Sequence, residues 1–338
     1  MASVRRTIFL LLFLLLAMPP CEAGDDQILI RVGSHVPERS IGIRRVIKPW
    51  MEAVAAEPGA RLRLDGYWGG ALGRSPQKQY DLVRAGILDV AWVLPAYTSG
   101  QFPEMGLFEL PFLFRDAREA SATGWQLHQE GLLTGLEDVR LIGFFTGGPN
   151  ALFLADPIND LQNLQRLKIR SFGAIHARWL SSWGAAPQTL SAADMNHALD
   201  RGVIDGAIQG WTGMQTFASF PLVDQAISIP LGATPFLLVM NARTWARLPE
   251  AARTSVMRHG GLALASAGAE AYTETDQAIH DRQASAGRLN IWAPSSPEQA
   301  RFERQAKAIH DDWIRRTPNG AAVYARALHI LQDMRAGQ

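Results

Sequence analysis

Short apolar runs alternate with amphipathic stretches along the N-terminal part of this chain. Three of the runs predict strands: 28–32, 61–64 and 90–94. Apolar positions at helical spacing predict a helix over 44–56, and a second helix is expected over 76–84. Pro49 lies inside the first helix and is expected to kink it or to delay its start. This βαβαβ order predicts a parallel sheet.

The same alternation continues through the rest of the chain. Helices are expected at 117–130, 175–183 and 194–201, and strands at 139–145, 151–154, 167–170, 207–208, 226–229, 236–240 and 289–292. The alanine-rich stretch Glu250–Ala286 is expected to form one extended helix, with Gly260-Gly261 as its weak point. Phe108–Phe114 is so apolar that we expect it to be a buried segment.

One phrase occurs twice: V-R-A-G-I-L-D-V-A recurs as L-D-R-G-V-I-D-G-A. In each copy a helix leads to a glycine, Gly86 or Gly202, which is expected to end that helix in the left-handed conformation. An aliphatic pair then predicts a short strand. Asp89 and Asp205 are expected to fix turns or cap neighbouring helices. Two such units predict two related α/β halves with a crevice between them.

The N-terminus has the pattern of a secretory signal peptide. Arg5 and Arg6 precede an apolar run that is too short to span a membrane, and a small-residue cleavage site follows. We expect residues 1–23 to be removed by cleavage after Ala23, which predicts a periplasmic protein. Lipoprotein processing at Cys21 is the alternative.

Composition narrows the possible functions. Cys21 is the only cysteine, so the chain after Ala23 can form neither a disulfide nor a cysteine-ligated metal site. The formal net charge of the chain is +1, and no cluster of Lys and Arg marks a surface for nucleic acid. No second long apolar run is present. We expect neither a nucleic-acid partner nor a cofactor or metal, and we expect a monomer.

Several short phrases, taken in their order and spacing, resemble one family. They are G-Y-W-G-G-A-L-G (66–73), A-G-I-L-D-V-A (85–91), P-E-M-G-L-F-E-L-P-F-L-F (103–114), L-K-I-R-S (167–171), W-G-A-A-P (183–187), A-L-D-R-G-V-I-D-G-A (198–207) and M-N-A-R-T-W-A-R-L-P (240–249). The ordered set is similar to the solute-binding proteins of tripartite ATP-independent periplasmic (TRAP) transporters, of the DctP type.

The resemblance implies a two-lobed α/β periplasmic binding protein with crossing hinge strands and a long helix spanning both lobes. Lobe one would comprise 24–147 plus 236–276, and lobe two 148–235 plus 277–338. The family's function would be to close on a small organic carboxylate and deliver it to the membrane subunits of a TRAP permease.

Arg170 is the first candidate for binding the ligand. It lies at the end of the predicted strand 167–170, where open α/β sheets bind their ligands. A guanidinium can grip a carboxylate through two parallel hydrogen bonds. The resemblance assigns the arginine of the K-I-R phrase to the substrate carboxylate. The alternative is an ordinary surface arginine after a strand.

Other positions differ from the members of the family that bind sialic acid. Asn150 and Tyr97 stand where those members carry arginines, and Leu94 replaces an acidic residue. Gln209 replaces the asparagine that follows the second repeat, and Trp211 lies two residues beyond it. Each replacement lowers the charge or adds aromatic surface. These differences predict a monocarboxylate ligand with an apolar or aromatic part. Alternatively, Asn150 and Gln209 could be amides that cap loops, and Trp211 could pack in the core.

Three further residues complete the candidate ligand-binding set: His35, Trp68 and Phe236. His35 follows the first strand, Trp68 lies in the glycine-rich loop, and Phe236 follows the crossing Pro235. Alternatively, His35 could cap an element or lie on the surface, and Phe236 could pack in the hinge. Trp92 is expected to pack in the core or hinge.

Three other functions stay open at this stage. An enzyme, such as a periplasmic hydrolase or lyase, is disfavoured because the sequence has no G-x-S-x-G, no H-E-x-x-H and no phosphate-binding loop. The same fold could instead bind a sugar acid or a dicarboxylate. It could also supply its ligand to a sensor in place of a transporter.

Overall fold

The structure is a computed structural model that describes residues 27–337. The expected signal peptide, its cleavage after Ala23 and the alternative site at Cys21 all lie outside the described residues. Within residues 27–337, no helix combines the length and the apolar character that a membrane crossing requires.

The first sheet has five strands in the order β2-β1-β3-β10-β4. They are β1 (Ile28–Gly33), β2 (Leu62–Tyr67), β3 (Val90–Val93), β4 (Val139–Pro149) and β10 (Ala233–Asn241). Strands β2 and β3 both pair with β1 in parallel, which confirms the predicted βαβαβ unit. Strand β10 runs antiparallel to both β3 and β4, so a strand from late in the chain completes this sheet.

The second sheet has six strands in the order β11-β9-β5-β8-β6-β7. They are β5 (Ala151–Leu154), β6 (Lys168–Ser171), β7 (Ala186–Thr189), β8 (Gly206–Gln209), β9 (Gln225–Ile227) and β11 (Asn290–Trp292). The chain crosses between the sheets at Asn150 and again over 228–232. The two crossings are hydrogen-bonded to each other, because Asn150 N–H donates to Gly232 O and Leu231 N–H donates to Asn150 O.

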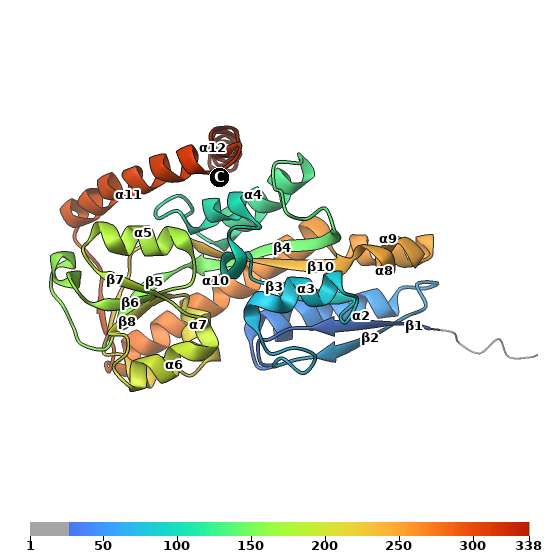
Figure 1. Ribbon diagram of the computed structural model, residues 1–338, viewed down its shortest axis with the longest axis horizontal. Coiled ribbons are helices and arrows are strands. Elements are labelled where there is room, and N and C mark those ends of the chain that lie inside the picture. Colours follow the sequence, from blue (N-terminus) through green and yellow to red (C-terminus); the bar gives the residue numbers. More distant parts are fainter. Residues whose placement is uncertain (1–26, 338) are drawn as a thin grey trace, which may run out of the picture.

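Helices cover both sheets (Figure 1). They are α2 (Lys48–Ala56), α3 (Gln79–Arg84), α4 (Ala117–Gln129), α5 (Ala174–Ser182), α6 (Ala192–Asp200), α7 (Trp211–Thr216), α8 (Ala242–Arg247), α9 (Glu250–Arg258), α10 (Gly261–Ala286), α11 (Ser296–Arg316) and α12 (Gly320–Ala336). Helix α10 contacts β4 of the first sheet and α7 beside the second, so it spans both halves.

The extended helix expected over 250–286 is broken. Helix α9 ends at Arg258, and α10 begins at Gly261, which has a φ of +57°. The break falls at the glycine pair that the sequence marks as weak. Pro49 does not delay the earlier helix: a π-helical turn over Gly42–Ile47 runs directly into α2 at Lys48, and the proline lies in the first turn of α2.

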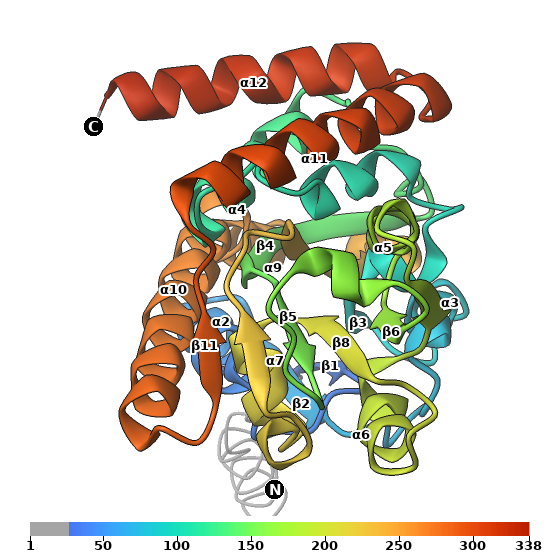
Figure 2. The same cartoon turned by 90° about the vertical axis from the view of Figure 1, so that its left-hand side faces the viewer.

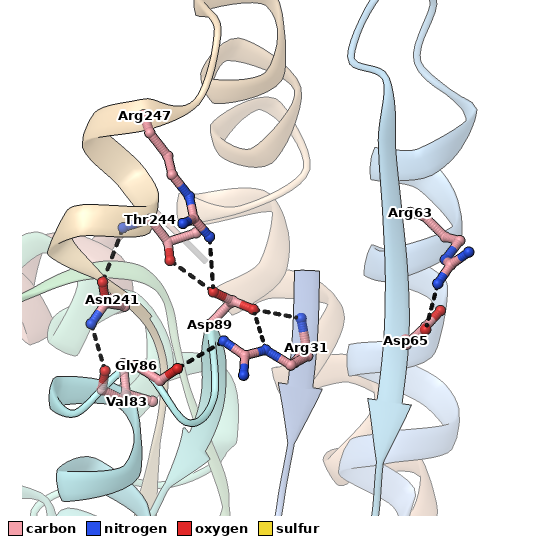
Figure 3. Close-up of polar contacts among 9 residues, drawn as sticks. All are labelled: Arg31, Arg63, Asp65, Val83, Gly86, Asp89, Asn241, Thr244 and Arg247. Carbon is pink, nitrogen blue, oxygen red and sulfur yellow. Dashed lines mark hydrogen bonds and ion pairs between the residues drawn. The ribbon is translucent and has the colours of Figure 1, made fainter. Parts of the chain in front are cut away.

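The two copies of the repeat adopt the same local structure. Gly86 and Gly202 have φ of +75° and +63°, which confirms the left-handed helix ends. Asp89 accepts a hydrogen bond from the backbone N–H of Arg31 at the adjacent strand, as shown in Figure 3. Asp205 accepts one in the same way from the backbone N–H of Lys168, at the start of β6. Each aspartate therefore ties its own strand to the neighbouring strand, and neither caps a helix.

The C-terminal helices lie together over one end of the molecule (Figure 2). Helix α11 packs on α5, but α12 packs on α4, where Arg326 pairs with Glu130 and Arg335 with Glu119. Helix α12 also contacts α11, so it touches elements of both expected lobes. The apolar segment Phe108–Phe114 is buried as expected, with Phe108, Leu110 and Phe114 at most 2% exposed.

Candidate functional site

A cavity lies between the two halves and has an empty volume of about 640 Å³ including its opening. The first sheet and its connections contribute His35, Ser40, Trp92, Leu94, Tyr97 and Phe236 to the lining, and α10 contributes Tyr272. The second half contributes Arg170, Phe172, Ala192, Gln209, Thr212 and Phe217, with Asn150 at the crossing. The lining is mostly apolar with a few polar groups, which is typical of small-molecule sites.

Arg170 is the cationic side chain in the cavity wall. It lies in β6 and is 1% exposed. Its Nε donates to Leu190 O at 3.0 Å and its Nη1 to Ile208 O at 2.9 Å, while its Cζ lies 5.1 Å from the centre of the Phe172 ring. Arg170 forms no ion pair with any acidic side chain in residues 27–337. Three of its N–H donors have no partner in these bonds, so the cavity presents an uncompensated positive charge.

Aromatic rings form the opposite part of the wall. The Trp92 ring lies 5.0 Å from Phe236, and Phe236 lies 5.3 Å from Tyr272. Phe145 stands behind these rings, 6.1 Å from Trp92 and 5.4 Å from Phe236. The three front rings come from β3, β10 and α10, so their positions depend on the junction of the first sheet with the long helix. This surface can bury a flat apolar group.

The two predicted amides line the cavity: Gln209 is the last residue of β8, and Asn150 directly precedes β5. Asn150 Nδ2 donates to Gly232 O at 2.9 Å, and Asn150 Oδ1 accepts from the Thr234 hydroxyl at 3.1 Å. Within the part of the chain that the structure describes, Gln209 Oε1 accepts only from the neighbouring Gly210 N–H, at 3.3 Å. Asn150 is therefore mostly used to join the crossing segments, whereas the amide of Gln209 retains free hydrogen-bonding capacity.

His35 and Tyr97 bring polar groups from the first half to the cavity. Burial lowers the pKa of His35 to about 4, so its imidazole is neutral at pH 7. Its ring packs edge-on against Tyr97, with centroids 6.1 Å apart. The Tyr97 Oη accepts a hydrogen bond from the backbone N–H of Ala192 at 3.0 Å. Arg39 Nε also reaches the second half and donates to Thr216 O at 2.8 Å, so the halves are in contact across the cavity mouth.

Two predicted residues lie elsewhere. Trp211 is 6% exposed and packs at 5.0 Å from both Phe153 and His280, within the core of the second half. It borders a separate cavity behind the crossing segments. Trp68 does not line the cavity that holds Arg170; its ring covers Gly66 in the glycine-rich loop. The flanking glycines that suggested a loop for Trp211 instead begin a short helix.

The sequence did not predict some of the residues that line the cavity. Trp92 packs in the core of the first half, as expected, and it also forms part of the cavity wall. Tyr272, Phe172 and Phe217 line the wall too. Trp92 lies on the same face of β3 as Leu94, which the family comparison had already singled out. The two-residue period of a strand could have identified it. Tyr272 had no signal of this kind, because its contact depends on how α10 crosses the sheet.

Asp276 on α10 accepts hydrogen bonds from the backbone of two residues that line the cavity. One carboxylate oxygen accepts from Thr212 N–H at 2.8 Å, and the other accepts from Gly148 N–H at 3.2 Å. Burial raises the pKa of Asp276 to about 6, against these hydrogen bonds, which favour the charged form. Thr212 and Gly148 both line the cavity, so Asp276 fixes the junction of β4 with α7.

The described residues offer no obvious metal site. No group of three or more His, Cys, Asp or Glu side chains in residues 27–337 is arranged to hold a metal ion. The chemistry available in the cavity is therefore an arginine, neutral polar groups and aromatic surface, an arrangement suited to binding an organic anion.

Comparison with known proteins agrees with this arrangement. Residues 32–316 match the family of bacterial extracellular solute-binding proteins, family 7, also called DctP. A curated relative, the outer membrane transporter protein TsaT of Comamonas testosteroni, is 23% identical over 283 residues, which cover 81% of this chain and 82% of the relative.

Two solved structures are similar over nearly their whole length. A TRAP solute-binding protein from Rhodoferax ferrireducens, in complex with copurified benzoate, is 25% identical with a TM-score of 0.85, covering 92% of this chain and 100% of that one. A marine metagenome TRAP solute-binding protein with 3-hydroxybenzoate is 25% identical with a TM-score of 0.86, covering 91% and 98%. The chain belongs to the bacterial extracellular solute-binding proteins of family 7, which include these TRAP solute-binding proteins.

Proposed function

We propose that this protein binds an aromatic monocarboxylate in the cavity between its two halves. The single observation that carries the proposal is Arg170, a buried guanidinium with unused donors and no acidic partner in residues 27–337. A buried cation of this kind is costly unless an anion compensates it. A ligand carboxylate provides that compensation through the planar geometry that a guanidinium favours.

The remaining wall favours one carboxylate and a flat apolar group. Trp92, Phe236 and Tyr272 supply aromatic surface, and burying a ring against them contributes roughly 1.5–3 kcal/mol. Among residues 27–337, Arg170 is the only Arg or Lys that lines the cavity, so a second carboxylate would lack a cation. The similar proteins with benzoate and 3-hydroxybenzoate support an aromatic acid for this chain.

We further propose that the protein works in the periplasm and supplies its ligand to the membrane subunits of a TRAP permease. In this proposal the expected lobes, 24–147 plus 236–276 and 148–235 plus 277–338, close about the crossings at Asn150 and 228–232. Helix α12 contacts α4 of lobe one as well as α11 of lobe two, so it bridges the two lobes. The ligand favours closure only through its higher affinity for the closed form. No enzymatic step is required.

Calorimetric titration of the protein tests the ligand class. Benzoate and 3-hydroxybenzoate are expected to bind with a negative heat-capacity change, which marks burial of apolar surface. Benzamide keeps the ring but lacks the negative charge, so it is the matched control and is expected not to bind measurably. Binding of succinate or of a sugar acid, without binding of benzoate, would overturn the aromatic assignment while leaving the family intact.

A further inference from the structure

Tyr97 connects the two halves of the molecule beside Arg170. It follows β3 of the first sheet, and its Oη accepts the backbone N–H of Ala192, the first residue of α6 in the second half, at 3.0 Å. The same hydroxyl neighbours the Arg170 guanidinium and favours its charged form. Tyr97, Ala192 and Arg170 all line the cavity. One hydroxyl from lobe one therefore lies next to two donor groups of lobe two.

A count of donors and acceptors shows what this hydroxyl lacks. A phenol has one O–H donor and can accept through its lone pairs. Ala192 N–H and the Arg170 guanidinium are both donors, so they can use only the acceptor side of the Tyr97 oxygen. No hydrogen bond among residues 27–337 uses the Tyr97 O–H as its donor. A hydrogen-bond acceptor in the cavity would satisfy the free O–H donor of Tyr97. Arg170 requires an anion in the same place.

We propose that Tyr97 donates its O–H to the carboxylate that Arg170 holds, so that the ligand's anionic group links the two lobes. The inference rests on the proposed function and assigns the closing contact within it. The carboxylate would accept from Arg170 of lobe two and from Tyr97 of lobe one, while Tyr97 accepts from Ala192 of lobe two. The ring of the ligand adds affinity, but the carboxylate controls closure.

Dissociation kinetics test the link. Tyr97→Phe keeps the ring and removes only the hydroxyl. Because a hydrogen bond to a charged group is worth more than a neutral one, benzoate dissociation is expected to accelerate about tenfold to a hundredfold. The association rate is expected to stay within about twofold, since the open form still presents Arg170. Tyr80→Phe is the matched control: its hydroxyl donates to Gly135 O at 2.8 Å, outside the cavity lining, and its loss should leave both rates unchanged.

The outcomes separate this inference from the proposed function. If the wild-type protein binds neither benzoate nor 3-hydroxybenzoate, both fail. If it binds them and Tyr97→Phe dissociates at the wild-type rate, only the inference fails. X-ray scattering gives a second measurement: saturating benzoate should compact the wild-type protein more than it compacts Tyr97→Phe. Equal compaction of the two proteins would also overturn the link.

Discussion

Asp89 and Arg170 are both buried charged side chains, and their surroundings differ completely. Asp89 is 2% exposed and bonds to the backbone N–H and Nε of Arg31, to the hydroxyl of Thr244 and to Arg247 (Figure 3). Arg170 is 1% exposed, yet within residues 27–337 it contacts two backbone carbonyls and an aromatic face and pairs with no carboxylate.

This difference separates a structural charge from a ligand-binding one. Burial raises the pKa of Asp89, but the hydrogen bonds from Arg31 and Thr244 outweigh it and hold the pKa below its usual range. Burial lowers the pKa of Arg170, and the Tyr97 hydroxyl opposes that effect. A buried charge costs several kcal/mol unless its partners compensate it. Asp89 is compensated by the fold, whereas Arg170 requires an anion from outside.

Replacing Asp89 should have the largest effect on stability. Asp89→Ala leaves Arg31 without its carboxylate and opens the junction of β1, β3 and α8. Removing one partner of a buried pair typically costs about 3–5 kcal/mol, and part-exposed Arg31 places this site toward the lower figure. Urea denaturation measures the loss. Benzoate affinity of the folded fraction should be unchanged, and a selective loss of affinity would contradict the structural role.

Replacing Arg170 should have the opposite result. Arg170→Ala is expected to weaken benzoate binding by about 2–5 kcal/mol in calorimetry, because the ligand carboxylate loses its buried cation. Arg170→Met, which keeps much of the side-chain length, should leave the ligand-free protein as stable as the wild type or more stable. A large loss of ligand-free stability in Arg170→Met would show that the fold, and not the ligand, needs this charge.

The two repeat glycines should show a smaller, matched effect. Gly86→Ala and Gly202→Ala each force a side chain into the left-handed region, at about 1–2 kcal/mol of folding stability. An added Cβ would meet its nearest atom at 3.6 Å at Gly86 and none within 4 Å at Gly202, so the costs should be nearly equal. Gly100→Ala is the control in thermal denaturation, since its φ is not positive. A much larger cost at Gly86 would argue against equivalent roles.

Glu109 shows a third way to bury a charge, which is to neutralise it. Burial raises the pKa of Glu109 to about 8 and lowers that of His176, 3.5 Å away, to about 4. A carboxyl group whose folded-state pKa is raised favours the folded state at low pH, and this contribution is lost as pH rises from 4.5 towards 8. His176 has the opposite effect: its lowered pKa means that stability falls as pH drops below 6.5, because protonation then favours the unfolded chain.

Glu109→Gln should therefore change the pH dependence of the free energy of unfolding more than its average value. Relative to the wild type, the variant is expected to gain stability as pH rises from 5 to 8, because its neutral amide has no proton to lose. Chemical denaturation at several pH values measures this slope. A difference between the two proteins that stays constant over that range would contradict a neutral Glu109.

Most of the fold could be predicted from the sequence because its elements follow local periodicity. The parallel βαβαβ unit and the helix-ending glycines are confirmed. The single helix expected over 250–286 is wrong, although it breaks at the glycine pair that the sequence marks as weak. The packing of α12 on α4 was not foreseen, since it depends on long-range ion pairs such as Arg335 with Glu119. Periodicity carries no information about such partners.

The site could be predicted in part. Arg170, Asn150, Gln209, Tyr97, His35 and Phe236 meet at one cavity, whereas Trp211 and Trp68 lie outside it. The glycines on both sides of Trp211 are typical of a loop, yet here Gly210 caps the short helix α7 and Gly213 lies within it. Tyr272 reaches the site only through the crossing of α10 over the first sheet, which no local pattern encodes.

A crystal structure of the protein with benzoate would test the central claim most directly. We expect the carboxylate within about 2.7–3.2 Å of Arg170 nitrogen atoms, with the Tyr97 hydroxyl donating to it and the ring against Trp92 and Phe236. A benzoate bound away from Arg170, or an Arg170 guanidinium paired with a protein carboxylate in the bound state, would contradict the account.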